Sequence, residues 1–187
     1  MKNVIRRSYL LLIYWFLNSF LCCNVNAQPA ATFQNEELHK EFKTEFMWNA
    51  NVKIANVINV GDSKYGSRRV IPITGGTFKG PNIKGEVLPG GEDWQLTRPD
   101  GDTELNARYL LKTDDGVVIQ VINRALIHMP KDGEKSAPYI KSVLDFEAPV
   151  NSNYSYLNHA IFIGTLNMPQ LKPGEEPYVI IGVYKVL

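Results

Sequence analysis

The sequence predicts an all-β fold built from antiparallel strands, and three observations point to it. Short runs that alternate apolar and polar residues recur along the chain, as half-buried strands require. Clusters of Gly, Pro, Asn and Asp separate these runs, and no long stretch has the 3.6-residue period of a helix. Strands without helical crossovers pair antiparallel, so an antiparallel sandwich or barrel is expected.

About nine strands are expected, and turn-forming residues bound them. The first shows the pattern clearly, because Phe46, Trp48, Ala50, Val52 and Ile54 alternate with mostly polar neighbours. The chain of 187 residues, 44% hydrophobic and 21% charged, has the composition of one globular domain. The expected strands span residues 46–54, 70–74, 83–88, 93–98, 103–113, 117–125, 140–147, 156–165 and 178–186.

The N-terminus has the pattern of an export signal. Lys2, Arg6 and Arg7 precede an apolar block at residues 9–23, and a small-residue cleavage pattern ends at Ala27. The block is shorter than the roughly 20 apolar residues that span a bilayer, which favours cleavage after Ala27 over a retained anchor. We therefore expect export to the periplasm or the extracellular space. The expected division is a signal peptide at 1–27, an N-terminal segment at 28–45 and a β-barrel domain at 46–187.

The expected exported body differs from the full chain in cysteine content and charge. The two cysteines, Cys22 and Cys23, both lie in the signal, so the body offers no disulfide, zinc-thiolate site or cysteine nucleophile. Lipidation at Cys22 or Cys23 is an alternative, although bulky Leu21 precedes Cys22. Without the three basic residues of the signal, the 20 basic residues fall to 17 against 19 acidic ones. This net acidic balance makes nucleic-acid binding unexpected.

The turn at residues 114–116, Asp-Asp-Gly, predicts the register of two strands. A three-residue turn with Gly116 in the left-handed region pairs odd-numbered residues with odd-numbered residues. The odd positions of the strand at 103–113 are its apolar ones, so they face the interior. Tyr109 is then expected opposite Val121.

The preceding turn at residues 99–101, Pro-Asp-Gly, leaves two registers open. A three-residue turn, which the turn chemistry favours, would direct Asp93 inward. A two-residue turn, which burial of an aromatic ring favours, would direct Trp94 inward instead. In the first case Asp93, Ala107 and Asn123 form one row on the inner face, and a buried carboxylate beside a carboxamide indicates ligand binding.

Several motifs occur in an order that resembles a known family. They are Gly66 to Pro81, Gly85 to Gly91 followed by Asp93-Trp94-Gln95, Ala107-Arg108-Tyr109, Thr113 to Gly116, Tyr156-Leu157-Asn158 and Val183-Tyr184. Together they resemble the domain of unknown function 3237 family, also called uncharacterised protein family 0311, over most of residues 46–187. Asn106 and Leu157 depart from the family pattern. The resemblance implies a single antiparallel β-barrel of the calycin-like kind, whose members hold small apolar molecules, and it implies no agreed substrate or cofactor.

Three residues are candidates for acid-base catalysis. Asp93 and Glu86 are strand carboxylates that could transfer protons, and Arg108 could stabilise an oxyanion if a bulge turned it inward. Strand parity alone places Arg108 on the outer face, where it would pair with Glu92 or Glu104.

Ligand contacts are expected from five residues, namely Trp94, Tyr109, Asn123, Asn158 and Glu147. The histidines His39, His128 and His159 lack metal-ligand spacing, so neither a metal site nor a cofactor is expected. The leading hypothesis is an exported barrel that binds a small, partly apolar molecule in its lumen, with no nucleic-acid partner and no membrane contact after signal cleavage. One alternative is a cofactor-independent lyase, isomerase or cyclase that uses acid-base residues of the barrel. Another is a structural or partner-binding domain with a filled core.

Overall fold

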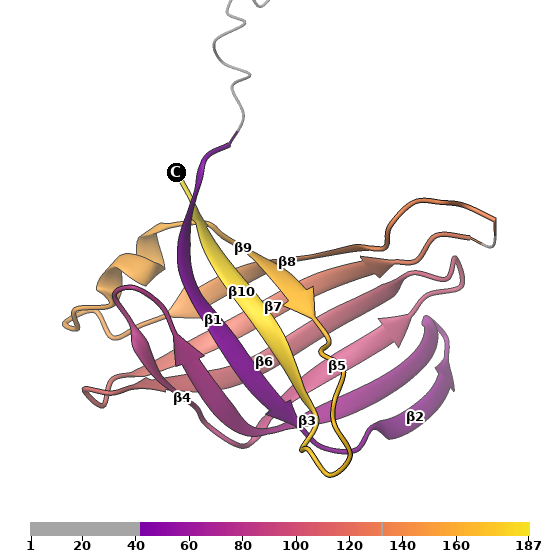
Figure 1. Ribbon diagram of the computed structural model, residues 1–187, viewed down its shortest axis with the longest axis horizontal. Coiled ribbons are helices and arrows are strands. Elements are labelled where there is room, and N and C mark those ends of the chain that lie inside the picture. Colours follow the sequence, from indigo (N-terminus) through magenta and orange to yellow (C-terminus); the bar gives the residue numbers. More distant parts are fainter. Residues whose placement is uncertain (1–41, 132) are drawn as a thin grey trace, which may run out of the picture. The chain divides into compact units, whose positions relative to one another are not determined.

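Ten antiparallel strands make up the described part of the chain, residues 42–131 and 133–187 of the computed structural model (Figure 1). They are β1 (Thr44–Ile54), β2 (Ile58–Ser63), β3 (Gly66–Lys79), β4 (Lys84–Val87), β5 (Gly91–Thr97), β6 (Thr103–Thr113), β7 (Val118–His128), β8 (Tyr139–Glu147), β9 (Phe162–Asn167) and β10 (Tyr178–Val186). A short 3-10 helix, η2 (Ser155–His159), precedes β9. The expected signal peptide and residues 28–41 lie outside the described residues.

The strands close into the antiparallel barrel that the sequence predicts. Eight strands form the closed barrel, and two lie outside it. Neighbouring strands follow the order β1-β10-β9-β8-β7-β6-β4-β3, and pairing between β1 and β3 completes the circle. The long strand β3 makes closure possible, because its first half pairs with β2 and β5 while its second half pairs with β4 and β1.

The alternating sequence pattern sets which side chains fill the barrel. In β6, Leu105, Ala107, Tyr109 and Leu111 are buried, while the residues between them are exposed. Tyr109 lies opposite Val121, as the three-residue turn predicts. The turn has the expected geometry, because the φ angle of Gly116 is 88° and its amide donates to the carbonyl of Thr113.

The turn between β5 and β6 resolves the register that the sequence left open. The amide of Arg98 donates to the carbonyl of Asp102 over 2.8 Å, so the turn contains three residues, and Gly101 takes a φ of 94°. Thr97 consequently lies opposite Thr103, and Asp93 opposite Ala107. Asp93 faces the interior, whereas Trp94 lies on the outer face.

One part of the barrel interior is packed with aromatic rings. The rings of Trp48 and Phe146 lie 5.2 Å apart, and those of Phe146 and Phe162 lie 4.9 Å apart in an edge-to-face arrangement. Trp48 also approaches Phe78 from β3 at 5.9 Å. These rings fill the section formed by the first half of β1 and the second half of β3, whereas side chains from the second half of β1 and the first half of β3 line an open cavity.

The structure differs from the expected strands in several places, and β3 is much longer than the expected strand at residues 70–74. Residues 156–161 were expected to begin a strand, but η2 occupies 155–159 and β9 begins at Phe162. The strand β2 was not expected, because its residues Ile58–Ser63 are all exposed and show no inward-facing apolar pattern. The barrel itself begins at Thr44, two residues before the expected boundary.

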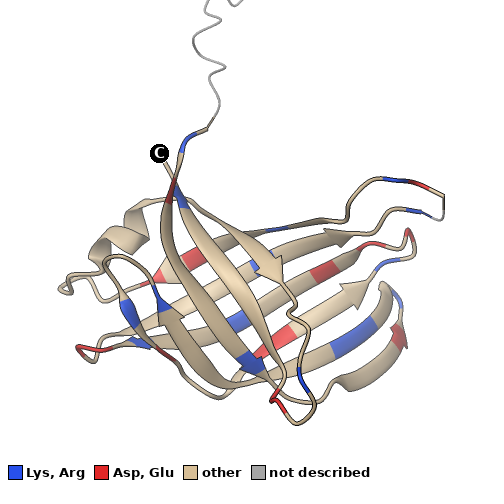
Figure 2. Ribbon diagram, in the orientation of Figure 1, with Lys and Arg blue, Asp and Glu red and all other residues tan. Residues whose placement is uncertain are grey.

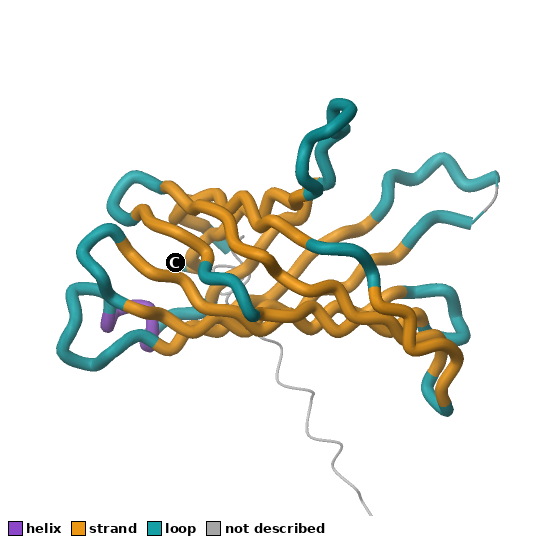
Figure 3. Tube along the Cα trace, turned by 90° about the horizontal axis from the view of Figure 1, so that it is seen from below, coloured by secondary structure: helices purple, strands orange, loops and turns teal. Residues whose placement is uncertain are grey.

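Loops lie at both ends of the strand layer (Figure 3). Residues 129–131 and 133–138, between β7 and β8, extend beyond the strands (Figures 1 and 3). Acidic and basic residues are interspersed over strands and turns (Figure 2). Among the residues that the structure describes, no helix has the length and apolar character to cross a membrane.

Candidate functional site in the barrel lumen

The barrel encloses a cavity of about 180 Å³ beyond its aromatic section. Apolar side chains from β1, β3, β7, β9 and β10 form most of its wall, with Tyr109 beside the aromatic section. Five polar side chains interrupt this apolar wall. They are Arg69 from β3, Asp93 and Gln95 from β5, Asn123 from β7 and Ser142 from β8.

Three of the polar residues form a hydrogen-bonded chain that leads into the cavity. Arg69, which is exposed, donates from Nε to Oε1 of Gln95 over 2.7 Å. Gln95, which is buried, donates from Nε2 to Oδ2 of Asp93 over 2.6 Å. The register accounts for the chain, because Arg69 lies opposite Gln95 across β3 and β5, and Asp93 is two residues away on the same face.

Three buried polar atoms on residues that line the cavity have no hydrogen-bond partner among the described protein groups. They are Oδ1 of Asp93, Oδ1 of Asn123 and Oγ of Ser142. Asn123 is only 7% exposed and Ser142 only 6%. A buried polar atom without a hydrogen bond costs about 1–3 kcal/mol, so three such atoms around one cavity require an explanation beyond stability.

The surroundings of Asp93 favour its neutral form. Burial raises the pKa of the Asp93 carboxyl above its usual value. The hydrogen bond from Gln95, followed by the nearby backbone amide of Asn106 and the charge of Arg69, lowers the same pKa and offsets part of this rise. Burial, followed by the charge of Asp93, also raises the pKa of the Tyr109 phenol, which stays neutral.

Three of the eight predicted site residues come together in the lumen. Asp93, Ala107 and Asn123 form one row across β5, β6 and β7, and Tyr109 lies one pair further along β6. Asp93, Tyr109 and Asn123 all line the cavity. This is the row that the three-residue turn at 99–101 predicts.

Four other predicted residues lie on the outer face, away from this cavity. Glu86 is exposed on β4 and forms an ion pair with Lys112 at 3.5 Å. Arg108 is exposed on β6 and Glu147 on β8, because each alternates with buried neighbours. Trp94 is 45% exposed, and its indole N–H donates to Glu92 over 3.0 Å.

Asn158 holds the loop before β9 in place. Its Oδ1 accepts from the amide of Ala148 over 2.8 Å, and its Nδ2 donates to the carbonyl of Ala148 over 2.9 Å. Both polar atoms of the carboxamide are therefore hydrogen-bonded to the backbone of Ala148. Asn158 thus links η2, to which it belongs, to Ala148 at the end of β8, and it is not among the cavity residues.

Sequence reasoning missed Arg69 and Ser142 and left Gln95 without a role. Ser142 precedes buried Leu144 and Phe146 at period two, so strand parity could have placed it inward. Gln95 shares the parity of Asp93 and follows from the same turn. Arg69 carries no such local signal, because its role depends on the pairing of β3 with β5.

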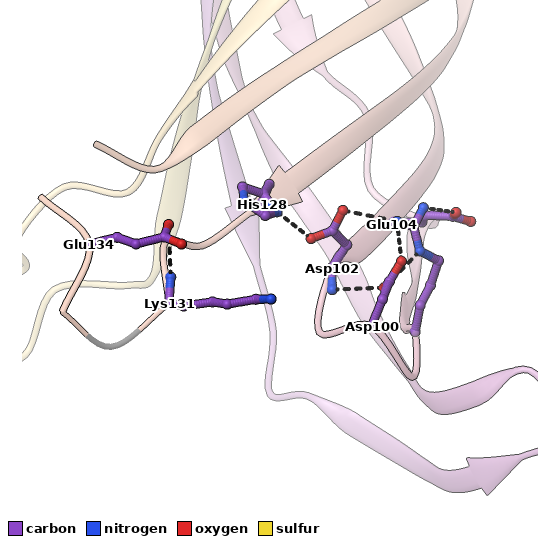
Figure 4. Close-up of polar contacts among 7 residues, drawn as sticks. Asp100, Asp102, Glu104, His128, Lys131 and Glu134 are labelled. Carbon is purple, nitrogen blue, oxygen red and sulfur yellow. Dashed lines mark hydrogen bonds and ion pairs between the residues drawn. The ribbon is translucent and has the colours of Figure 1, made fainter. Parts of the chain in front are cut away.

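A charged cluster lies where β5 and β7 end and β6 begins (Figure 4). Asp102 accepts from Arg98 over 2.9 Å and contacts Nδ1 of His128 over 2.6 Å. Arg98 also pairs with Asp100 and Glu104, each over 2.8 Å. His128 directly follows Ile127, a cavity residue, so these contacts connect the end of β7 to the β5–β6 turn. Within the described ranges no three His, Cys, Asp or Glu side chains are placed to hold a metal ion.

Comparison with known proteins gives the family. The family model described as "Protein of unknown function (DUF3237)" matches residues 42–186. The chain belongs to this family. A UPF0311 protein from Rhodopseudomonas palustris is 37% identical over 155 residues, covering 78% of this chain and 97% of the relative.

Solved structures of DUF3237 relatives share the barrel. A protein of unknown function from Rhodopseudomonas palustris has a TM-score of 0.69 at 33% identity, over 79% of this chain and 99% of its own. A "beta-barrel like protein" from Acinetobacter baumannii has a TM-score of 0.67 at 32% identity, over 79% and 98% of the two chains.

A more distant relative has a named activity. The "Hydroalkoxylation enzyme phnH" of Penicillium herquei is 29% identical over 121 residues, covering 65% of this chain and 72% of the relative. A solved enzyme structure from the same organism has a TM-score of 0.60 at 25% identity, over 79% of this chain and 96% of its own. A DUF3237 barrel is thus similar to at least one catalyst.

Proposed function

We propose that the lumen of this DUF3237 barrel binds a small, largely apolar molecule that carries a hydroxyl group. The observation that carries the proposal is the set of three unpartnered polar atoms on Asp93, Asn123 and Ser142 around one apolar cavity. A bound hydroxyl would remove the cost of leaving them without hydrogen bonds. We further propose that binding takes place outside the cytoplasm, as the expected signal at residues 1–27 predicts.

The size of the cavity limits the ligand to about one ring. An engineered apolar cavity of roughly 150 Å³ holds benzene. The lumen measures about 180 Å³, so it has room for a six-membered ring with a short substituent. The apolar walls would contact the ring, and the polar row would hold the substituent.

The polar row favours a hydroxyl over an anionic group. Oδ1 of Asp93 and Oδ1 of Asn123 are both acceptors when Asp93 is ionised, and Oγ of Ser142 can accept or donate. A ligand hydroxyl can donate to one of these atoms and accept from another. A carboxylate would place a second negative charge beside Asp93, which is unfavourable in a buried site.

Calorimetric titration with benzyl alcohol and toluene tests this proposal. Both ligands have one ring, and they differ by the hydroxyl. Benzyl alcohol should bind at least about tenfold more tightly, because one hydrogen bond to a buried group contributes about 1.4 kcal/mol. The Asn123→Leu variant should lose most of the preference, whereas Asn51→Leu, on the exposed side of β1, should keep it. Equal affinities, or no binding of either ligand, would refute lumen binding of a hydroxyl ligand.

A second candidate function is proton-transfer catalysis by Asp93. Two observations favour it, namely the raised pKa of this buried carboxyl and the similarity to a hydroalkoxylation enzyme. Hydroalkoxylation adds an O–H bond across a C=C bond, so a C–O bond forms, the π bond breaks and the hydroxyl proton ends on carbon. Protonated Asp93 would give its proton to the alkene carbon and recover one from the hydroxyl. The step balances without a cofactor.

Turnover of 2-allylphenol to its cyclic ether would test catalysis separately from binding. The substrate has one ring, a hydroxyl and an alkene, close to what the lumen admits. Wild-type protein should form the ether faster than buffer does, and Asp93→Asn should remove this rate while retaining calorimetric binding. Binding without any turnover by the wild type would leave the lumen a binding site and refute the catalytic candidate for this substrate class.

A further inference from the structure

The outer face of the barrel carries a groove of about 720 Å³, which shares only Leu105, Ala125 and Ser142 with the lining of the lumen cavity. It runs across β5, β6, β7, β8 and β9 on the side opposite to the cavity. One cross-strand row forms its centre, because each residue lies opposite the next in the strand register. The row is Trp94, Asn106, Arg124, Val143 and Ile163.

The groove exposes large apolar side chains in one place. Trp94 is 45% exposed, Tyr139 52%, Val143 57% and Ile163 39%. The hydrogen bond from the indole N–H to Glu92 holds the ring of Trp94 in one orientation. Asn106 and Arg124 separate Trp94 from Val143 and Ile163, so the groove presents two exposed apolar areas with polar side chains between them, and exposed apolar areas of this kind indicate a site that another molecule covers.

The charges beside this surface are mainly positive. Arg68, Arg124 and Lys141 line the groove, and none of them forms an ion pair with another described residue. The acidic residue of the groove, Glu104, is paired with Arg98 over 2.8 Å. Three cations therefore remain available beside an apolar floor.

We propose that this groove binds a small amphipathic organic anion, such as an aryl carboxylate or aryl sulfonate. The aromatic part would lie on Trp94, and the anionic group would pair with Arg124. Adjacent strands lie about 4.8 Å apart, so Trp94 and Arg124, two strands apart, are separated by about 10 Å. That distance suits a ligand of two or more rings with an acid at one end.

The volume and charge balance favour a small ligand over a macromolecule. Ligand sites typically measure about 300–1,000 Å³, and the groove falls within this range. The proposal does not depend on the function of the lumen, whose 180 Å³ is too small for a ligand of this class.

Fluorescence titration of the full chain with 8-anilinonaphthalene-1-sulfonate tests the proposal. The neutral compound N-phenyl-1-naphthylamine, which lacks the sulfonate, serves as the matched probe. We expect the sulfonate to bind at least about tenfold more tightly, and this preference should weaken as salt is added. Arg124→Gln and Lys141→Gln should each weaken sulfonate binding at least threefold, and Trp94→Ala should weaken both probes.

Two control variants separate the groove from other sites. Lys112→Gln removes a lysine from the outer face of β6 outside the groove, and it should leave sulfonate binding unchanged. Ala107→Leu fills the lumen and should also leave it unchanged. Melting temperatures of all variants check that the barrel persists.

Three outcomes would overturn the proposal. The first is sulfonate binding that Ala107→Leu removes and Arg124→Gln does not, which would assign the probe to the lumen. The second is absence of binding or equal affinity for the neutral probe. The third is a dimer in sedimentation equilibrium that Trp94→Ala converts to monomer, since a second copy would then cover the groove.

Discussion

Gln95 donates a hydrogen bond from Nε2 to Oδ2 of Asp93 over 2.6 Å, and the two residues lie two positions apart on β5. The carboxamide of Gln95 can do this because Arg69 holds its oxygen from the other side. One oxygen of Asp93 is thereby fixed, and the other, Oδ1, is buried without a hydrogen-bond partner among the described protein groups. Arg69 and Gln95 thus orient the carboxyl group of Asp93, and neither contributes one of the three unpartnered polar atoms.

Gln95→Leu should raise the pKa of Asp93. The substitution removes a hydrogen bond that lowers this pKa, and it leaves burial, the largest cause of the upward shift, in place. The carboxyl carbon chemical shift of Asp93, followed against pH by NMR, measures the effect. Gln120→Leu, on the neighbouring part of β7 but outside the lumen cavity, is the control. An unchanged or lower pKa in Gln95→Leu would show that the hydrogen bond does not govern the ionisation of Asp93.

Asp93→Asn should stabilise the protein at neutral pH. The folded-state pKa of Asp93 lies above the unfolded one, so its favourable contribution is complete below the unfolded pKa of about 3.9 and is lost as pH rises through the folded pKa. Asparagine avoids the cost of burying a charge, a cost that grows as pH rises and Asp93 ionises. We expect a gain of about 1 kcal/mol in the free energy of unfolding at pH 7, which shrinks toward pH 3.

Urea unfolding at several pH values measures this difference. The same substitution at exposed Asp145, on the outer face of β8, is the control and should have little effect on stability. A loss of stability at pH 7 in Asp93→Asn would contradict the expectation, because it would mean that the charged form is favoured in the folded state.

The sequence could predict the lumen row as one of two registers, but it could not decide whether Asp93 or Trp94 faces inward. Turn chemistry at residues 99–101 and burial of Trp94 favoured opposite registers, and the alternation pattern of a short strand cannot decide between them. The structure follows the turn. Exposure of Trp94 is tolerated because its indole N–H pairs with Glu92 and its ring contributes to the outer groove.

The hydrogen-bonded chain to Asp93 and the strand β2 could not be predicted because both depend on how distant strands pair. The chain from Arg69 through Gln95 to Asp93 requires β3 and β5 to pair in one register, and no turn links those strands directly. The unexpected strand β2 pairs with β3 through its backbone, while all of its residues are exposed, so hydrophobic periodicity could not reveal it. The all-β class and the inward parity of Tyr109 needed only local information, and both are confirmed.

Gly164→Ala should destabilise the barrel beside the lumen. A Cβ atom at Gly164 would overlap Oγ of Ser142 and lie 2.8 Å from Cδ1 of Leu144, so both side chains would have to move. We expect a loss of about 1–3 kcal/mol, the usual cost of overpacking. In a Ser142→Ala background the loss should be smaller, because one of the two clashing atoms is gone.

A double-mutant cycle of Gly164→Ala and Ser142→Ala, measured by urea unfolding, gives the interaction energy between the two positions. The interaction energy between Gly164 and Ser142 should differ from zero by at least 0.5 kcal/mol, the lower limit typical of residues in contact. Strictly additive losses would show that Ser142 does not lie against Gly164 in solution.

Asn158→Ala should destabilise the protein without changing the lumen. The variant loses both hydrogen bonds to the backbone of Ala148, and we expect a cost of about 2 kcal/mol, roughly 1 kcal/mol for each bond. Asn153→Ala, at an exposed position before η2, is the matched control and should cost less than 0.5 kcal/mol. Thermal or urea unfolding measures the loss, and benzyl alcohol affinity should remain that of the wild type.

Asn158→Asp separates the two hydrogen bonds of this carboxamide. An ionised aspartate still accepts from the Ala148 amide but cannot donate to the Ala148 carbonyl. At pH 7 the variant should therefore lose at least the roughly 1 kcal/mol of stability that one hydrogen bond contributes. Protonation restores the donor, so the difference from wild type should narrow as pH falls below about 4. If the aspartate variant matched wild type at pH 7, or if Asn153→Ala cost as much as Asn158→Ala, the paired contact with Ala148 would not be what holds this loop to β8.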